Sequence, residues 1–238
     1  MRDKRKDKEY FEKYIQAIGE HIHDTAALIE KVKNEKGEDF QGFLNGCVIL
    51  EDYYKDMING LYCIDEPIEK IEIIFPKLNG CITKYWRKGN SSYWNLIEAL
   101  SLAVLLNAEK EEVEKLKELL KKENVKDYLI DYMMNYLDKD WEVKTDELMF
   151  KSPFSKLKKV TECENKKEAL DLLKNYLDKD WYKSRKSTGW YDSHEKDRLL
   201  YSGYWSYEAG AVSKIMGLED EDMREQQYYP YDMVHFKR

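Results

Sequence analysis

The sequence lacks the short motifs that mark the common enzyme classes. It has no GxxxxGK[ST] phosphate loop, no GxSxG nucleophile elbow and no HExxH zinc motif. No apolar run approaches the roughly 18 residues that a membrane span requires. The charged first residues, Met1 to Lys8, contain no apolar signal core. These absences predict a cytoplasmic protein that binds a partner, without catalytic residues, a metal or a cofactor.

Proline, glycine and cysteine are scarce. The chain has only 4 prolines and 11 glycines, and it is rich in lysine and glutamate, so long helices are expected. Its 4 cysteines, Cys47, Cys63, Cys81 and Cys163, form no CxxC pair and mostly lie among apolar residues. We expect them to be reduced and buried, as in a reducing compartment.

Positive charge is outnumbered by negative charge. There are 40 Lys and Arg residues against 47 Asp and Glu residues, which gives a net charge of −7. A phosphate backbone requires a cationic face, so direct nucleic-acid binding is disfavoured. An acidic protein is suited to a basic protein partner.

Apolar residues recur at helical spacing through the first half. The pattern predicts helices over residues 8–35, 40–61, from Pro67 onward, 93–106 and 109–122. Pro76 should end or kink the third helix, because proline lacks the amide hydrogen. The helix over 93–106 is almost wholly apolar and should lie in the core.

The second half continues the helical pattern. It predicts a helix over 125–137, a loop over 183–193 and a last long helix over 195–216 that Gly217 ends. Pro230 predicts an extended strip from Tyr228 onward. The fold class is therefore all-α, a compact stack of antiparallel helical hairpins. The charged stretch at Glu123 and Asn124 divides it into domains 1–123 and 124–238.

One heptapeptide occurs twice. Asn135-Tyr-Leu-Asp-Lys-Asp-Trp141 returns unchanged as Asn175 to Trp181, 40 residues later. This spacing is that of a two-helix repeat, so an internal repeat is predicted in the C-terminal half. Each copy should end a helix, with Trp141 and Trp181 packed at the corners.

Carboxylates in the predicted second helix form one candidate site. Asp52 and Asp56 share a helix face, with Glu51 beside them, and together they could bind a metal in a helical hydrolase. The milder interpretation, which we favour, is an acidic surface that includes partner binding. His21 and His23 are two residues apart on a helix and point to different sides, so a metal dyad is disfavoured.

The C-terminal block is the most distinctive part of the chain. Tyr204, Trp205, Tyr207 and Glu208 lie among small residues and are predicted to be structural. Glu208 could be a catalytic carboxylate, but a buried acceptor for an arginine or a tyrosine hydroxyl is favoured. Acids and aromatics further along are candidates for partner contacts: Glu219, Asp220, Glu221, Asp222, Tyr228, Tyr229, Tyr231 and Asp232.

This block resembles a known family. Gly203-Tyr-Trp-Ser-Tyr-Glu-Ala-Gly-Ala-Val212, the acidic link after Leu218 and Tyr228-Tyr-Pro-Tyr-Asp232 resemble the C-terminal domain of PoNi-type (polymorphic nuclease immunity) bacterial immunity proteins. The charged helix start from Arg2 to Phe11 resembles the beginning of that family's N-terminal domain.

The resemblance implies an all-helical antitoxin. Such a protein binds a secreted PoNe-type DNase in the cytoplasm of the producing cell, and the family carries no catalytic residues. An acidic face would then steer onto the basic DNA-binding cleft of the cognate toxin. A generic helical adaptor is the other non-enzymatic alternative.

Overall fold

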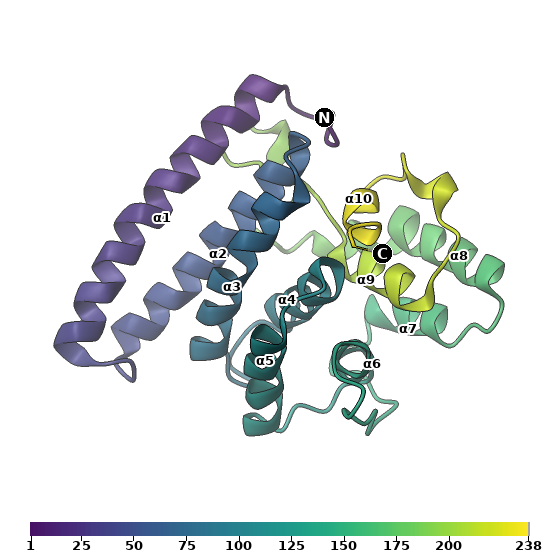
Figure 1. Ribbon diagram of the computed structural model, residues 1–238. Coiled ribbons are helices and arrows are strands. Elements are labelled where there is room, and N and C mark those ends of the chain that lie inside the picture. The colour runs from purple at the N-terminus through teal and green to yellow at the C-terminus, as the bar shows by residue number, and fades with distance from the viewer. Residues whose placement is uncertain (238) are drawn as a thin grey trace. The chain divides into compact units, whose positions relative to one another are not determined.

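The computed structural model describes residues 1–237 and contains helices but no strand within them. The all-α prediction is confirmed. The chain divides into two compact units, and the segments of Figure 1 can be followed by colour. Unit 1 holds Met1–Ser91 and Asp192–Tyr204, and unit 2 holds Ser92–Tyr191 and the chain from Trp205 onward.

Unit 1 contains three long helices, α1 (Lys8–Lys36), α2 (Gln41–Cys63) and α3 (Ile68–Tyr85). Helix α2 packs against both neighbours and is the middle element. The α1–α2 contact depends on small residues, because a Cβ on Gly46 would lie 2.5 Å from Ile29 Cγ1. These helices lie where the hydrophobic periodicity places them.

Helix α3 does not end at Pro76, which was one of the two expected effects of the proline. The helix neither ends nor restarts there but runs on to Tyr85, with Pro76 exposed inside it. Ile71, Phe75 and Leu78, which flank the proline, are buried. Burial of this apolar face outweighs the single backbone hydrogen bond that proline removes.

Unit 2 contains the shorter helices. They are α4 (Tyr93–Leu106), α5 (Lys110–Lys122), α6 (Tyr128–Leu137), α7 (Phe154–Thr161), α8 (Lys166–Asn175), α9 (Tyr207–Met216) and α10 (Tyr231–Val234). Helix α4 contacts α5, α6, α9 and α10, and nearly all its residues are buried. Its predicted place in the core is confirmed.

Two predictions for the C-terminal region are wrong. The last long helix does not begin at residue 195; α9 starts at Tyr207, although Gly217 ends it as expected, in the left-handed conformation (φ 59°). The tail is not an extended strip, because Pro230 caps the helical turn α10. Proline is accepted at a helix start, where no amide hydrogen bond is lost.

The repeated heptapeptide adopts two conformations, so the internal repeat is not confirmed as a structural one. The first copy leaves α6 at Leu137 and turns, whereas the second continues α8 as a π-helix (Tyr176–Trp181). Tyr136 is half-buried, while Tyr176 is buried. The tryptophans have similar partners: Trp141 donates its indole N–H to Asp131 (2.9 Å), and Trp181 donates to Glu208 (2.8 Å).

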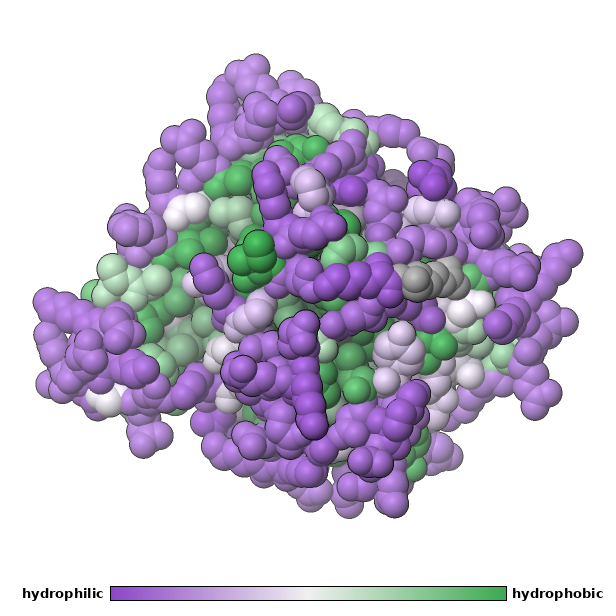
Figure 2. Space-filling view, in the orientation of Figure 1, coloured by the Kyte–Doolittle hydropathy of each residue, from purple (hydrophilic) through white to green (hydrophobic). Residues whose placement is uncertain are grey.

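The surface is largely hydrophilic on the face that Figure 2 shows, with apolar residues visible between charged ones. Among the described residues, no helix is both long and apolar enough to cross a membrane. The predicted domain boundary at Glu123 and Asn124 lies between α5 and α6, within unit 2, and stays a prediction.

Candidate functional site

The three carboxylates of α2 do not converge. Glu51 is buried and accepts a hydrogen bond from Tyr85 of α3 (3.2 Å). Asp52 is exposed beside Lys55 (3.2 Å), and Asp56 is bonded to Tyr14 of α1. No cluster of three metal-ligating side chains occurs in the described chain. Asp52 is therefore the only one of the three that presents a fully exposed charge.

Asp56 is held in a half-buried polar site. Tyr14 and Ser202 both form hydrogen bonds to its carboxylate, and these bonds lower its pKa. Burial is the larger effect and raises the pKa of Asp56 above its ordinary value. The two histidines of α1 are exposed, and the His21 ring packs against Tyr53 at a centroid distance of 5.3 Å.

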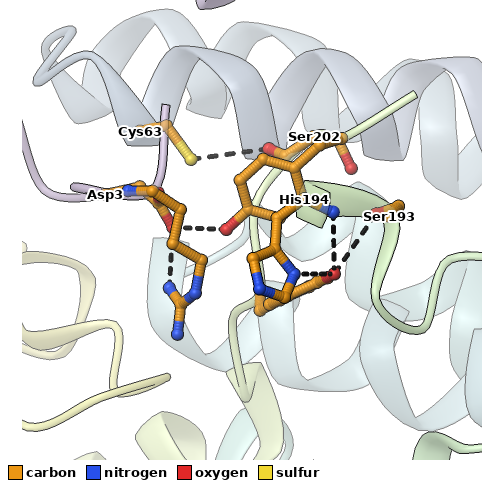
Figure 3. Close-up of polar contacts among 8 residues, drawn as sticks. Asp3, Cys63, Ser193, His194 and Ser202 are labelled. Carbon is orange, nitrogen blue, oxygen red and sulfur yellow. Dashed lines mark hydrogen bonds and ion pairs between the residues drawn. The ribbon is translucent and has the colours of Figure 1, made fainter. Parts of the chain in front are cut away.

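A segment from the second half of the sequence completes unit 1. Residues 192–204, which we call the strap, are fixed at both ends (Figure 3). The two ends are joined to each other, because the Tyr204 hydroxyl lies 3.0 Å from His194 Nδ1 and 3.3 Å from Ser193 Oγ. Between these ends, Tyr201 donates its hydroxyl hydrogen to the buried Asp3 (2.6 Å).

The strap also contacts α1 and α2. The Tyr201 amide donates to the Tyr10 hydroxyl (2.8 Å), and the Cys63 thiol donates to the Ser202 carbonyl (3.4 Å). Asn59 donates to the Ser202 hydroxyl (3.4 Å). These contacts explain why residues 196–204 are not helical: groups of Tyr201 and Ser202 form their hydrogen bonds with other parts of unit 1.

Glu208 is the centre of a buried polar cluster in unit 2. One carboxylate oxygen, Oε1, accepts hydrogen bonds from Tyr176 (3.2 Å), Trp181 (2.8 Å) and Arg185 (3.0 Å). Arg185 is itself buried, and its guanidinium lies 3.3 Å from the centroid of Trp94. The arrangement has the geometry of the structural acceptor that the sequence predicts, with both an arginine and a tyrosine hydroxyl as partners.

The two C-terminal motifs are packed against each other. The Ser206 amide donates to the Tyr228 carbonyl (2.8 Å), and α9 contacts α10. A Cβ on Gly210 would lie 2.6 Å from Pro230, so only glycine lets the tail approach this closely. Tyr207 is buried, as is Tyr204 within unit 1, whereas Trp205 is only half-buried.

The predicted acidic turn is divided by burial. Glu219, Glu221 and Asp222 are exposed. Asp220 is fully buried, accepts a hydrogen bond from the Tyr229 hydroxyl and lies 2.9 Å from His235 Nε2. Asp220 therefore anchors the tail and adds no charge to the surface.

The predicted tail contacts are divided in the same way. Tyr229 and Tyr231 are buried, whereas Tyr228 and Asp232 are half-buried. Tyr228 has φ 69°, in the left-handed region that a bulky residue seldom adopts. Of the three predicted tail tyrosines, Tyr228 is the one whose ring is partly exposed, and it contacts other aromatic rings.

Tyr228 belongs to an aromatic cluster on unit 2, formed with Tyr182, Trp190 and Tyr191. All four side chains are half-buried. Tyr182 stacks on Tyr191 (4.6 Å between centroids) and on Tyr228 (5.2 Å). Of the four rings, only Tyr228 was selected from the sequence, where residues 183–193 were expected to form a loop. The adjacent aromatics Trp190 and Tyr191 within that loop, with Tyr182 just before it, were the available signal.

The fold and the buried clusters define an all-helical protein in which many of the most distinctive side chains are buried and hydrogen-bonded to one another. Family models extend this. A model described as "PoNe immunity protein (PoNi), N-terminal" matches residues 2–118, and one described as "PoNe immunity proteins (PoNi), C-terminal" matches residues 125–233. The chain belongs to this family of PoNe immunity proteins.

One solved structure shows the same fold. The crystal structure of protein PA2201 from Pseudomonas aeruginosa is similar with a TM-score of 0.65 and 15% sequence identity, over 94% of this chain and 88% of that one. At this identity the likeness concerns the fold alone. No curated protein matches the sequence.

Proposed function

We propose that this protein binds a cognate PoNe nuclease toxin in the cytoplasm of the producing cell and neutralises it. The observation that carries the proposal is the pair of family models, which between them span residues 2–233 with a gap of only 119–124. The inhibitor would act by occupying the toxin's surface, and it needs no reaction of its own.

Exposed acids supply the electrostatic part of the mechanism. Unit 2 presents Glu219, Glu221 and Asp222, and unit 1 presents Asp52. A nuclease that holds DNA is basic where the DNA lies, so these carboxylates attract that surface from a distance. Because Glu51 and Asp220 are buried, they are left out of the proposed contact.

The test is inhibition of the purified cognate nuclease. The toxin is the nuclease encoded beside this protein, and the substrate is plasmid DNA. We expect cleavage to stop when the two proteins are equimolar, together with a stable complex in size-exclusion chromatography. Undiminished cleavage at a tenfold excess of this protein would rule out the proposal. A nuclease of another toxin class serves as the specificity control.

A further inference from the structure

The aromatic cluster of Tyr182, Trp190, Tyr191 and Tyr228 has the composition of a binding hot spot. All four rings remain partly exposed while contacting one another. Tyrosine and tryptophan carry much of the binding energy at protein interfaces, because a large rigid ring loses little conformational entropy on contact. Clustered tyrosine and tryptophan rings are more often packed into the core of a protein than left partly exposed, as these four are.

Buried residues of unit 2 hold the aromatic cluster in place. Trp181 is buried and contacts both Tyr228 (4.8 Å) and Trp190 (6.1 Å). Its indole N–H is fixed by Glu208 (2.8 Å), which Arg185 also binds. The rings are therefore held in place before any partner arrives, which lowers the entropic cost of binding.

The backbone beneath the cluster is unusual at two points. Tyr228 is left-handed (φ 69°), a conformation that costs a non-glycine residue about 1–2 kcal/mol. Residues Tyr176–Trp181 form a π-helix, a feature found frequently at functional sites. Tyr182 directly follows this π-helix, and its ring is nearly parallel to that of Tyr228, with only 8° between their planes.

The chemistry of the cluster favours a cation. Elsewhere in this chain arginines lie over aromatic rings, as Arg185 does over Trp94 (3.3 Å) and Arg224 over Tyr231 (4.6 Å). The exposed carboxylates Asp178 and Glu225 are near in sequence, and Asp178 is bonded by Gln226 (2.8 Å), two residues before Tyr228. The face of an aromatic ring is a binding site for a guanidinium or an ammonium group.

We propose that the aromatic cluster is the anchor by which the protein holds its nuclease, and that it receives an arginine or lysine side chain of that partner. This inference rests on the proposed function and adds the place and the chemistry of the contact. The charges on the exposed acids guide the approach, and the rings slow dissociation.

Removal of two of the rings tests whether the nuclease binds at the aromatic cluster. Tyr182 and Tyr191 are replaced together by alanine, and the dissociation constant with the cognate nuclease is measured by calorimetry. We expect affinity to fall by about tenfold or more, because hot-spot truncations have effects of this size. The control is Tyr136→Ala, a half-buried tyrosine of the same unit whose ring lies by Lys139. It should change affinity by less than about threefold.

Two charge variants test the chemistry. Tyr191→Lys and Tyr191→Glu both remove the ring and add one charge, so the main difference between them is the sign of that charge. If the partner contributes a cation, the lysine variant binds more weakly than the glutamate variant, with the larger difference at low salt. Lys183 and Lys186 are exposed on the same segment and would repel a cation of the partner. The sign of the difference between the two variants is therefore not fixed in advance by the local charge. Equal affinities, or a weaker glutamate variant, would overturn the cationic assignment.

The outcomes separate this inference from the proposed function. If the wild-type protein fails to bind the nuclease, the proposed function is wrong and the anchor falls with it. If the wild-type protein binds the nuclease and the double alanine variant at Tyr182 and Tyr191 binds it with the same affinity, only the anchor is wrong. Tyr191→Phe keeps the ring and should retain affinity, which separates loss of the ring from any other effect of substitution at this position. A wild-type dimer that Tyr191→Lys dissociates would overturn the proposal in favour of self-association.

Discussion

Buried carboxylates are the residues on which much of this protein's local structure depends. Glu208 and Asp131 each accept the indole N–H of a tryptophan, and Asp3 accepts the Tyr201 hydroxyl. A buried charge is tolerated only when it is paired or hydrogen-bonded. These carboxylates therefore fix the positions of buried aromatic side chains.

Glu208→Gln should destabilise the protein. The substitution leaves the buried guanidinium of Arg185 without its opposite charge, and breaking a buried pair is costly. We expect the free energy of unfolding, measured with urea, to fall by about 3 kcal/mol. Glu219→Gln, at an exposed position in the same unit, is the control and should change it by less than about 0.5 kcal/mol. Equal effects would show that the pair contributes nothing.

Asp56→Asn should stabilise the protein at neutral pH. Burial raises the pKa of Asp56 above its ordinary value of 3.8, so keeping it ionised at pH 7 costs free energy. The folded wild type binds more protons than the unfolded chain between these two pKa values, and its stability falls as pH rises through the raised pKa. Asparagine removes this cost.

We expect the melting temperature of Asp56→Asn to exceed that of the wild type by about 1–3 °C at pH 7. The gain should shrink as the pH falls towards 3.8. Asp52→Asn, one turn away on the exposed face of α2, is the control and should change the melting temperature less at pH 7. If the difference in melting temperature instead grew as the pH falls, the raised pKa of Asp56 would be contradicted.

At the scale of elements, long amphipathic helices could be predicted closely and irregular segments could not. The predicted helix over 8–35 is observed as Lys8–Lys36, and that over 93–106 as Tyr93–Leu106. Their apolar periodicity is local information. Residues 195–204 of the strap were wrongly assigned to a helix. Local periodicity does not reveal that Tyr201 bonds to Asp3 and Tyr10, which are far away in the sequence.

The repeated heptapeptide shows the same limit. Identical residues turn out of α6 in one copy and extend α8 as a π-helix in the other. The tryptophans bind Asp131, ten residues before Trp141, and Glu208, 27 residues after Trp181. Tertiary partners select between conformations that the local sequence leaves nearly equal in energy.

Pro76→Ala should stabilise α3. Proline in a helix interior removes a backbone hydrogen bond, and Pro76 is exposed, so alanine creates no packing conflict. We expect a rise of about 1–3 kcal/mol in the free energy of unfolding, measured with urea. Lys77→Ala, at the next exposed position, controls for a general preference for alanine and should stay within about 0.5 kcal/mol. An unchanged stability would mean that the helix already compensates for the proline.

At the scale of the whole molecule, the net charge of −7 should govern the rate of association. Attraction between an acidic inhibitor and a basic nuclease accelerates encounter and is screened by salt. We expect the association rate with the cognate nuclease, measured by stopped flow, to fall by about tenfold between 20 mM and 500 mM salt. A rate that does not depend on salt would remove electrostatic steering from the mechanism.

The acidic turn can be tested in the same assay. Lysine at Glu219, Glu221 and Asp222 should slow association more than lysine at Glu111, Glu114 and Glu118, three exposed acids of α5. The two variants have the same net charge, so their difference reports position. Asp220 is kept unchanged because it is buried. Equal slowing would indicate that only total charge matters.

The candidate site was predictable in part. Tyr228 was selected from the sequence, and Glu208 was expected to accept hydrogen bonds from an arginine or a tyrosine hydroxyl, both of which are among its partners. Arg185, Tyr182, Trp190 and Tyr191 were missed, because their importance comes from contacts with residues distant in the chain. Burial also removed Glu51, Asp220, Tyr229 and Tyr231 from the exposed surface.

The sequence by itself determined the all-helical class, the long helices and the family, because periodicity and short motifs are properties of neighbouring residues. Only the tertiary structure decided which acids are exposed, that residues 192–204 complete unit 1, and that four aromatic rings meet on unit 2. The physical reason is that burial and hydrogen bonding are settled by the groups that share a space, and most of those groups here are far apart along the chain.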